Sequence, residues 1–311
     1  MKKPLLLLSA LLAPLAIVQV APASAAESSA STLSEKLQPY IQCYNELSGR
    51  AYESRARYLS WSKETGPTGK ERIIYGLYTI SDPARCAANV EGAGKAEPRD
   101  AALESAGDAY VKAVTELAPL LKEANDYYDQ SNYKDDKMAK GKALHPKLMA
   151  AWAKFEAADK SLDAIITALN DKVQLEELAA VEKAEGKQAR YYLMSTMIKA
   201  KALVRAESNV SAEALPKITE TLDAYEASVK AMDDYSASGK KAIGSMFTSK
   251  AKEFLTSAKG LMRRIRDKTP YEAGEKMLMS GGGAWMVAGS PPRVMRDYNE
   301  LVEAYNRGSD I

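Results

Sequence analysis

The stretch AALESAGDAYVKAVTELAPLLKEANDYYD, residues 101–129, sets the fold class, because its apolar residues recur at helical spacing without interruption. The residues on this repeat lie alternately three and four positions apart: Leu103, Ala106, Tyr110, Ala113, Leu117, Leu120, Ala124 and Tyr127. That alternation places all of them along one side of an α-helix, as in the seam of a coiled coil. Val114, Leu121 and Tyr128 widen the seam into the broader stripe of a bundle helix. The spacing therefore predicts a helix over 99–129 that buries one face against other helices.

Helical spacing continues on both sides of this stretch. The further helices that it predicts lie over about residues 34–62, 137–206, 211–238, 241–267 and 291–306. Ser290 is a predicted N-cap of the last of these helices. The range 137–206 is either one bent helix or two helices that meet near 183–188, where Gly186 is a weak point. Residues 71–97 fit either a short helix or an extended segment.

These patterns favour an all-α fold, because no stretch shows the strict alternation of a β-strand. We expect an elongated antiparallel bundle of about six long helices, whose mutual contacts bury most of the apolar surface. No linker divides the chain. Residues 26–311 are therefore predicted to form a single all-helical domain, with Gly281-Gly282-Gly283 as a candidate hinge.

The first 25 residues have the features of a secretory signal peptide. A basic start, MKK, precedes the apolar run 5–20, and small residues at A-x-A spacing end at Ala25. We expect cleavage after Ala25 and export of the remaining chain to the periplasm. No cysteine lies near this position to accept a lipid anchor. No second long apolar run follows, so no integral membrane segment is predicted in the mature chain.

The charge balance gives no overall attraction to a polyanion. The chain has 43 Lys and Arg residues and 41 Asp and Glu residues. Removal of residues 1–25 takes away Lys2 and Lys3 and no acidic residue, which leaves 41 of each sign. Such a balance argues against nucleic acid as a partner. The net charge of the chain also provides no overall attraction to anionic membranes. The short basic run 263–266 is interpreted as a solvated helix end.

Cys43 and Cys86 are the only cysteines. An even number in an oxidising compartment predicts one disulfide bond. In the chain-entropy account, closing a loop of this length contributes about 3–4 kcal/mol to stability. A redox pair is the alternative, but the sequence has no C-x-x-C motif to support it.

The sequence lacks the motifs of the common enzyme classes. His145 is the only histidine, so neither H-E-x-x-H nor the Glu-x-x-His of a di-iron bundle can form. Phosphate-binding loops and G-x-S-x-G elbows are absent as well. We therefore predict no catalytic, cofactor-binding or metal-binding residues and no cofactor, and we interpret His145 as a surface or capping histidine.

Carboxylates leave one enzymatic alternative open. Asp135 and Asp136 are adjacent, and Glu177 follows Glu176. Neighbouring residues on a helix point about 100° apart, so such pairs do not converge on one point. Asp135, Asp136 and Glu177 are nevertheless the candidates for an envelope hydrolase that uses carboxylates.

Tyrosine is unusually common, with 17 Tyr against 3 Phe. Because tyrosine combines an apolar ring with a polar tip, it suits half-exposed helix seams, and it also suits a groove for sugar or peptide. The sequence leaves both readings open.

Tyr-Asn pairs occur near both ends of the chain. Their members are Tyr44, Asn45, Tyr298, Asn299, Tyr305 and Asn306. The last two pairs are seven residues apart and share a helix face. We expect the first and last helices to pack together, with these amides either fixing the register between them or forming a polar binding patch.

Three segments resemble the YiiG-like family of bacterial cell-envelope proteins. They are YIQCYN at 40–45, YYDQSNYKDD at 127–136 with MAKGKALH at 138–145, and YNELVEAYN at 298–306. The resemblance covers about residues 36–307. It implies an all-helical envelope protein built around a domain of unknown function, and it transfers no functional residue. Some members of the family look like lipoproteins, and this chain departs from them because it lacks an acceptor cysteine.

The observations together favour a non-enzymatic periplasmic helical protein. Its expected partner is an unknown envelope protein or a small ligand. The alternatives are the carboxylate-dependent hydrolase and a structural spacer or adaptor.

Overall fold

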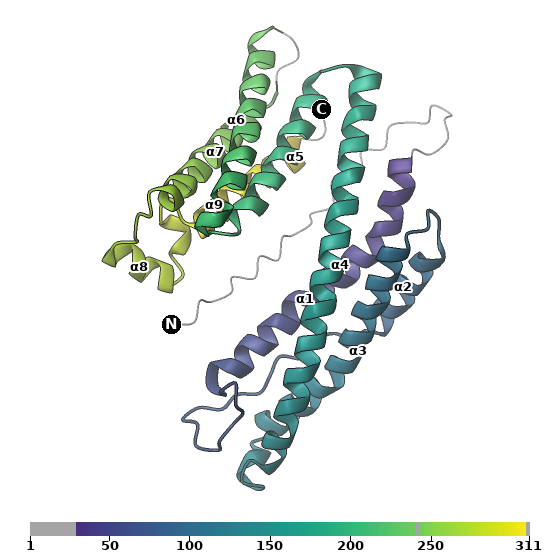
Figure 1. The fold of residues 1–311 in the computed structure, drawn as a ribbon, viewed down its shortest axis with the longest axis vertical. Helices are drawn as coiled ribbons and strands as arrows, with labels where there is room; N and C mark the ends of the chain where they lie inside the picture. Colours follow the sequence, from purple (N-terminus) through teal and green to yellow (C-terminus); the bar gives the residue numbers. More distant parts are fainter. Residues whose placement is uncertain (1–28, 240–242, 309–311) are drawn as a thin grey trace. The chain divides into compact units, whose positions relative to one another are not determined.

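Helices make up the fold of residues 29–239 and 243–308, which are the residues that the computed structural model describes. Figure 1 shows these residues as helices joined by connecting segments. Within the described ranges, β pairing is confined to an isolated bridge between Lys63 and Gly66. The all-α prediction is confirmed. None of the described helices is both long enough and apolar enough to span a lipid bilayer. The predicted signal peptide lies outside the described residues.

Nine α-helices follow one another along the described part of the chain. They are α1 (Ser29–Trp61), α2 (Ala84–Lys95), α3 (Ala101–Asp129), α4 (Ala139–Glu185), α5 (Ala189–Glu207), α6 (Leu215–Ala237), α7 (Ser245–Arg266), α8 (Ala273–Ser280) and α9 (Pro291–Gly308). Seven of these contain 18 residues or more, one more than the six long helices expected. α2 and α8 are the two short ones.

The long segment after residue 137 consists of two helices. α4 ends at Glu185, and Gly186 has a φ of +73°, a left-handed conformation that costs glycine little. α5 then begins at Ala189. The sequence had left one bent helix and two helices open, and the break lies within the predicted range 183–188.

The range 71–97, for which the sequence predicted either a short helix or an extended segment, contains both. Residues 72–80 have no regular secondary structure, and α2 follows from Ala84. We call residues 72–80 the extended segment.

The described chain divides into two units by its internal contacts. Residues 29–173 belong to the N-terminal unit and residues 174–308 to the C-terminal unit, so that α4 contributes to both. Each unit has its own hydrophobic core. Whether the chain unfolds as the single domain expected from the sequence stays a prediction.

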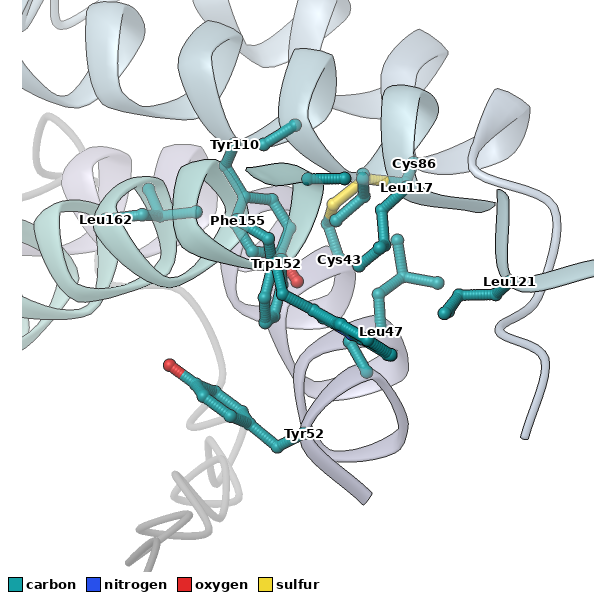
Figure 2. Packing of buried hydrophobic residues seen from close by; sticks show 14 of the residues in the cluster. Cys43, Leu47, Tyr52, Cys86, Tyr110, Leu117, Leu121, Trp152, Phe155 and Leu162 are labelled. Atoms are coloured by element: carbon teal, nitrogen blue, oxygen red, sulfur yellow. A yellow bond between two sulfur atoms is a disulfide. The ribbon is translucent and has the colours of Figure 1, made fainter. Parts of the chain in front are cut away.

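The core of the N-terminal unit forms where α1, α3 and α4 present their apolar faces to one another. Seven of the eight seam residues of α3 are buried, and Leu120 is half-buried. Figure 2 shows Leu47 of α1, Leu117 of α3 and Trp152 and Phe155 of α4 in this cluster. The helical periodicity that defined residues 101–129 therefore does bury one face of α3.

The core of the C-terminal unit is built mainly from α5, α6, α7 and α9. Tyr225 of α6 and Phe254 of α7 are fully buried, and their rings meet edge to face with centroids 5.1 Å apart. Tyr225 also donates a hydrogen bond to the carbonyl of Ala251, which satisfies its hydroxyl in the core.

Candidate functional site

An open groove runs along the N-terminal unit between α1 and the extended segment. Its volume is about 520 Å³, within the range of small-ligand sites. α1 lines it with one face, because its residues follow a spacing of three and four, and the extended segment adds two tyrosines. The lining residues are Glu53, Ala56, Arg57, Ser60, Tyr75 and Tyr78. We call this site the tyrosine groove.

Arg57 holds the extended segment against α1. Its Nε donates to the carbonyl of Gly76 at 2.6 Å, and its Nη1 donates to the hydroxyl of Tyr78 at 3.3 Å. Its guanidinium lies 4.9 Å from the ring centroid of Tyr75 and 4.6 Å from that of Tyr78. Arg50 adds a second guanidinium 3.8 Å from the Tyr78 ring. Such cation–π contacts fix the two rings beside α1.

Gly76 allows the extended segment to pass close to the end of α3. A Cβ at this position would lie 2.5 Å from Oδ1 of Asn125 and 3.1 Å from Cβ of Asp129. A larger residue here would require the Asn125 side chain or the segment itself to move. The small size of Gly76 therefore helps to position Tyr75, which precedes it, and Tyr78, two residues further on.

The tyrosine groove offers an aromatic face beside hydrogen-bonding groups. Tyr75 is 38% exposed, although it is a large hydrophobic side chain. Glu53 and Ser60 are exposed on the α1 side, where Glu53 pairs with Arg50 at 3.0 Å. This combination suits a ligand with both an apolar face and hydroxyl or amide groups.

A buried carboxylate lies elsewhere in the same unit. Asp159 of α4 is only 3% exposed and accepts hydrogen bonds from Ser48 at 2.5 Å, Tyr52 at 3.0 Å and Tyr44 at 3.5 Å. Ser48 is also hydrogen-bonded to the hydroxyl of Tyr110 on α3 at 2.7 Å. Burial raises the pKa of Asp159, and the hydrogen bonds from Ser48 and Tyr52 oppose that rise. This polar network ties three helices together.

His145 was predicted to be a surface or capping histidine; it is buried, so the surface alternative is wrong. Its Nδ1 lies 2.9 Å from the hydroxyl of Tyr58, and its Nε2 lies 3.0 Å from the carbonyl of Glu64. A carbonyl accepts only, so Nε2 carries a proton and donates to it. No feature of the sequence indicated that Tyr58 would be the hydrogen-bond partner of His145. His145 thus anchors the chain just beyond α1.

The predicted disulfide between Cys43 and Cys86 is present. It joins α1 to α2 with a Cα–Cα distance of 5.1 Å (Figure 2). Both cysteines are buried in the core of the N-terminal unit. The bond therefore fixes the far end of the extended segment, which leads directly into α2.

The candidate carboxylates of the hydrolase alternative do not form one cluster in either unit. Asp136 accepts a hydrogen bond from Tyr127 at 2.7 Å and another from the backbone N–H of Lys140 at 2.8 Å, and these contacts lower its pKa. It therefore supports the first turn of α4. Asp135 is exposed, and Glu177 belongs to the C-terminal unit, where burial raises its pKa.

Comparison with known proteins identifies the family. Residues 31–307 match the family described as protein of unknown function (DUF3829). The chain belongs to the DUF3829 family. It is 38% identical over 279 residues to the uncharacterized protein YiiG of Escherichia coli strain K12, covering 88% of this chain and 78% of the relative. No solved structure matches it. The resemblance to the YiiG-like family is confirmed.

The Tyr-Asn pairs of this DUF3829 chain are divided between the two units. Tyr44 and Asn45 lie on α1, where Tyr44 joins the Asp159 network and Asn45 is exposed. The pairs on α9 have half-buried tyrosines, Tyr298 and Tyr305, and exposed asparagines, Asn299 and Asn306. Pairing of the amides between the first and last helices stays a prediction.

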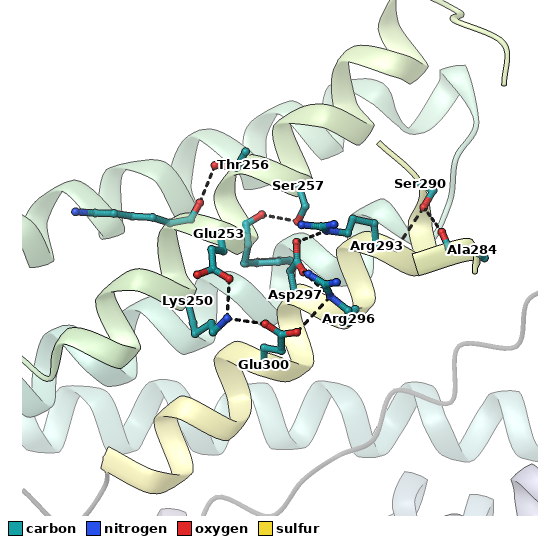
Figure 3. A network of polar contacts seen from close by, with 12 residues as sticks. Lys250, Glu253, Thr256, Ser257, Ala284, Ser290, Arg293, Arg296, Asp297 and Glu300 are labelled. Atoms are coloured by element: carbon teal, nitrogen blue, oxygen red, sulfur yellow. Dashed lines mark hydrogen bonds and ion pairs between the residues drawn. The ribbon is translucent and has the colours of Figure 1, made fainter. Parts of the chain in front are cut away.

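A network of charges on α9, which periodicity did not reveal, is joined to α7 through one ion pair. Asp297 is 1% exposed and pairs with Arg293 at 2.9 Å and with Arg296 at 2.7 Å (Figure 3). Lys250 of α7 pairs with Glu300 of α9 at 2.7 Å. The network satisfies the buried carboxylate of Asp297 and so has a structural role.

Sequence reasoning missed the tyrosine groove. The available signal was the segment Tyr75-Gly76-Leu77-Tyr78, in which a glycine and a leucine separate two tyrosines. Arg57, which contacts both tyrosines, lies on α1, and no local sequence pattern identifies it as their partner. The contact between them depends on the tertiary fold.

Proposed function

We propose that this protein is exported to the periplasm and acts there as a non-enzymatic binding protein, with the tyrosine groove as its ligand site. The observation that carries the proposal is the open groove itself, in which Tyr75 presents an exposed ring beside Glu53, Arg57 and Ser60. The signal-like residues 1–25 and membership of a family related to YiiG are compatible with a role at the envelope.

The chemistry of the tyrosine groove favours a short oligosaccharide. A sugar ring presents a C–H face that can lie against the Tyr75 ring and hydroxyl groups that hydrogen-bond to polar side chains. Glu53 supplies acceptors, and Ser60, which donates to the carbonyl of Arg57, keeps its oxygen as an acceptor. The groove is open at the surface, so a chain of several sugar units could extend beyond it.

Titration calorimetry with an N-acetylhexosamine tetrasaccharide tests the proposal. We expect Tyr75→Ala to weaken binding about tenfold, the effect of losing roughly 1.4 kcal/mol of ring contact. The matched control is Tyr191→Ala, because Tyr191 is half-buried in the C-terminal unit and also carries a cation–π contact, with Lys187. Equal affinity of the wild type and Tyr75→Ala, or no binding of the tetrasaccharide, would reject the oligosaccharide assignment.

A further inference from the structure

The C-terminal unit displays an unusual group of exposed apolar side chains. Nine large hydrophobic residues are exposed in the described part of the chain, and four of them lie within residues 277–286. These four are Met277, Leu278, Trp285 and Met286, and Met277 reaches 77% exposure. They belong to α8 and to the short 3-10 turn Ala284–Met286 that follows it. We call them the methionine-tryptophan patch.

The members of the methionine-tryptophan patch lie close together. A Cβ added at Gly283 would come within 2.8 Å of Cδ2 of Leu278 and within 2.7 Å of Cε of Met286. The side chains of Leu278 and Met286 therefore both lie next to Gly283. α8 and the 3-10 turn are also in direct contact. The exposed side chains thus form a local surface and are not scattered single residues, which would need no explanation.

Contacts with α7 and a capped helix end hold the methionine-tryptophan patch in place. A capping box between Glu272 and Glu275 closes the first turn of α8. Glu275 also pairs with Arg264 of α7 at 2.7 Å, and the same guanidinium donates to the carbonyl of Ala288 beyond the 3-10 turn at 3.0 Å. α7 therefore holds both ends of the patch. A held apolar surface loses less conformational freedom on binding than a flexible one.

Basic residues surround the methionine-tryptophan patch, although the chain as a whole is nearly neutral. Residues 263–300 contain seven basic and five acidic residues, an excess of two positive charges, and four of the basic ones, Arg264, Arg266, Arg293 and Arg296, are paired with carboxylates. Lys276 is exposed directly beside Met277, and Lys268 is exposed in the connection before α8. The guanidinium of Arg296 lies 4.9 Å from the ring centroid of Trp285. The patch therefore combines apolar side chains with a local excess of positive charge.

We propose that the methionine-tryptophan patch docks on the surface of a bilayer that contains anionic phospholipid. Apolar side chains on a short helix enter the boundary between headgroups and acyl chains, and nearby Lys and Arg residues attract anionic headgroups. Tryptophan favours that boundary because its ring is amphipathic. The basic residues favour this occupant over an uncharged apolar protein groove. The local charge, and not the net charge of the chain, provides the attraction.

Vesicle sedimentation of the mature chain, residues 26–311, tests the proposal. We expect binding to vesicles of phosphatidylcholine with phosphatidylglycerol, weak binding to phosphatidylcholine alone, and a decrease as salt increases. The double variant Met277→Ser with Leu278→Ser should reduce the partition coefficient by at least about tenfold. Met246→Ser is the matched control, because Met246 is an exposed methionine of the same unit outside the patch.

Tryptophan fluorescence provides a second measurement that does not depend on the serine variants. The emission of Trp285 should shift to shorter wavelength when anionic vesicles are added. Trp285→Phe should abolish the shift, because Trp152 is buried and Trp61, the third tryptophan, is half-buried against the core of the N-terminal unit, outside the patch. The proposal is overturned if the wild type does not bind anionic vesicles, or if the double variant binds them as well as the Met246→Ser control does. Binding that ignores lipid charge would overturn the role of the basic residues.

Discussion

At the scale of single residues, two buried carboxylates, Asp159 and Glu207, have opposite surroundings. Asp159 in the N-terminal unit accepts three hydroxyl hydrogen bonds. Glu207, at the end of α5, is 1% exposed, and neither of its carboxyl oxygens has a hydrogen-bond partner among the described residues. A satisfied buried group stabilises a particular packing, whereas an unsatisfied one costs free energy. The two residues should therefore respond differently to substitution.

Substitution of Asp159 by alanine should destabilise the protein by about 1–3 kcal/mol, because the hydroxyls of Ser48 and Tyr52 lose their acceptor in the core. Urea unfolding followed by circular dichroism measures the loss. Asp135→Ala, which removes an exposed carboxylate, is the control and should change stability by less than about 0.5 kcal/mol. Equal stability of the two variants would show that the network contributes little.

Substitution of Glu207 by glutamine should remove a dependence of stability on pH. Burial raises the pKa of Glu207 from its ordinary value to about 9. Between these two values the folded state binds more protons than the unfolded state, so stability falls as pH rises through this window. Glu207→Gln should therefore be more stable than the wild type at pH 8, by at least about 1 kcal/mol, and the difference should shrink toward pH 4. Unfolding in urea at a series of pH values measures it. A difference that does not change with pH would contradict the assignment.

At the scale of helices and connections, periodicity predicted the long elements well and the short ones poorly. α3 and α9 begin and end within two residues of their predicted limits, because long apolar stripes are specified locally. α8 has only eight residues and contains Gly274, so its pattern is too short to detect. The path of the extended segment depends on Arg57 and Gly76 in distant parts of the fold. For the same reason the tyrosine groove could not be predicted, while the disulfide, which needs only two cysteines, could.

The break between α4 and α5 can be tested through its backbone conformation. Gly186→Ala should destabilise the protein by about 1 kcal/mol, because φ is +73° and no neighbouring atom lies within 4 Å of an added Cβ. Gly49→Ala is the control. Gly49 lies inside α1 with similar free space, so alanine there should stabilise by about 0.5–1 kcal/mol. Chemical unfolding of both variants should give changes of opposite sign.

At the scale of the whole chain, α4 is one continuous helix whose residues are divided between the two units, and each unit has its own hydrophobic core. A continuous helix can couple the unfolding of two units. If one unit unfolded alone, the part of the helix that belongs to it would also lose its backbone hydrogen bonds. This arrangement is compatible with the single domain predicted from the sequence.

Calorimetry with and without a reductant tests the coupling. For a single domain we expect one transition, which moves to lower temperature as a whole when the Cys43–Cys86 bond is reduced. In the chain-entropy account the bond contributes about 3–4 kcal/mol. The double variant Cys43→Ser with Cys86→Ser should unfold at the reduced temperature under both conditions. Two transitions, with only one of them sensitive to the reductant, would show that the units unfold separately.

The disulfide also encloses the tyrosine groove in a covalent ring. Both walls of the groove, from Glu53 to Tyr78, lie in the chain between Cys43 and Cys86, and so does the exposed residue Lys70. Proteolytic cleavage after Lys70 would therefore leave two fragments still bonded to each other. They would migrate together on a non-reducing gel and separate on a reducing one, and a protein nicked in this way could keep both walls of its site.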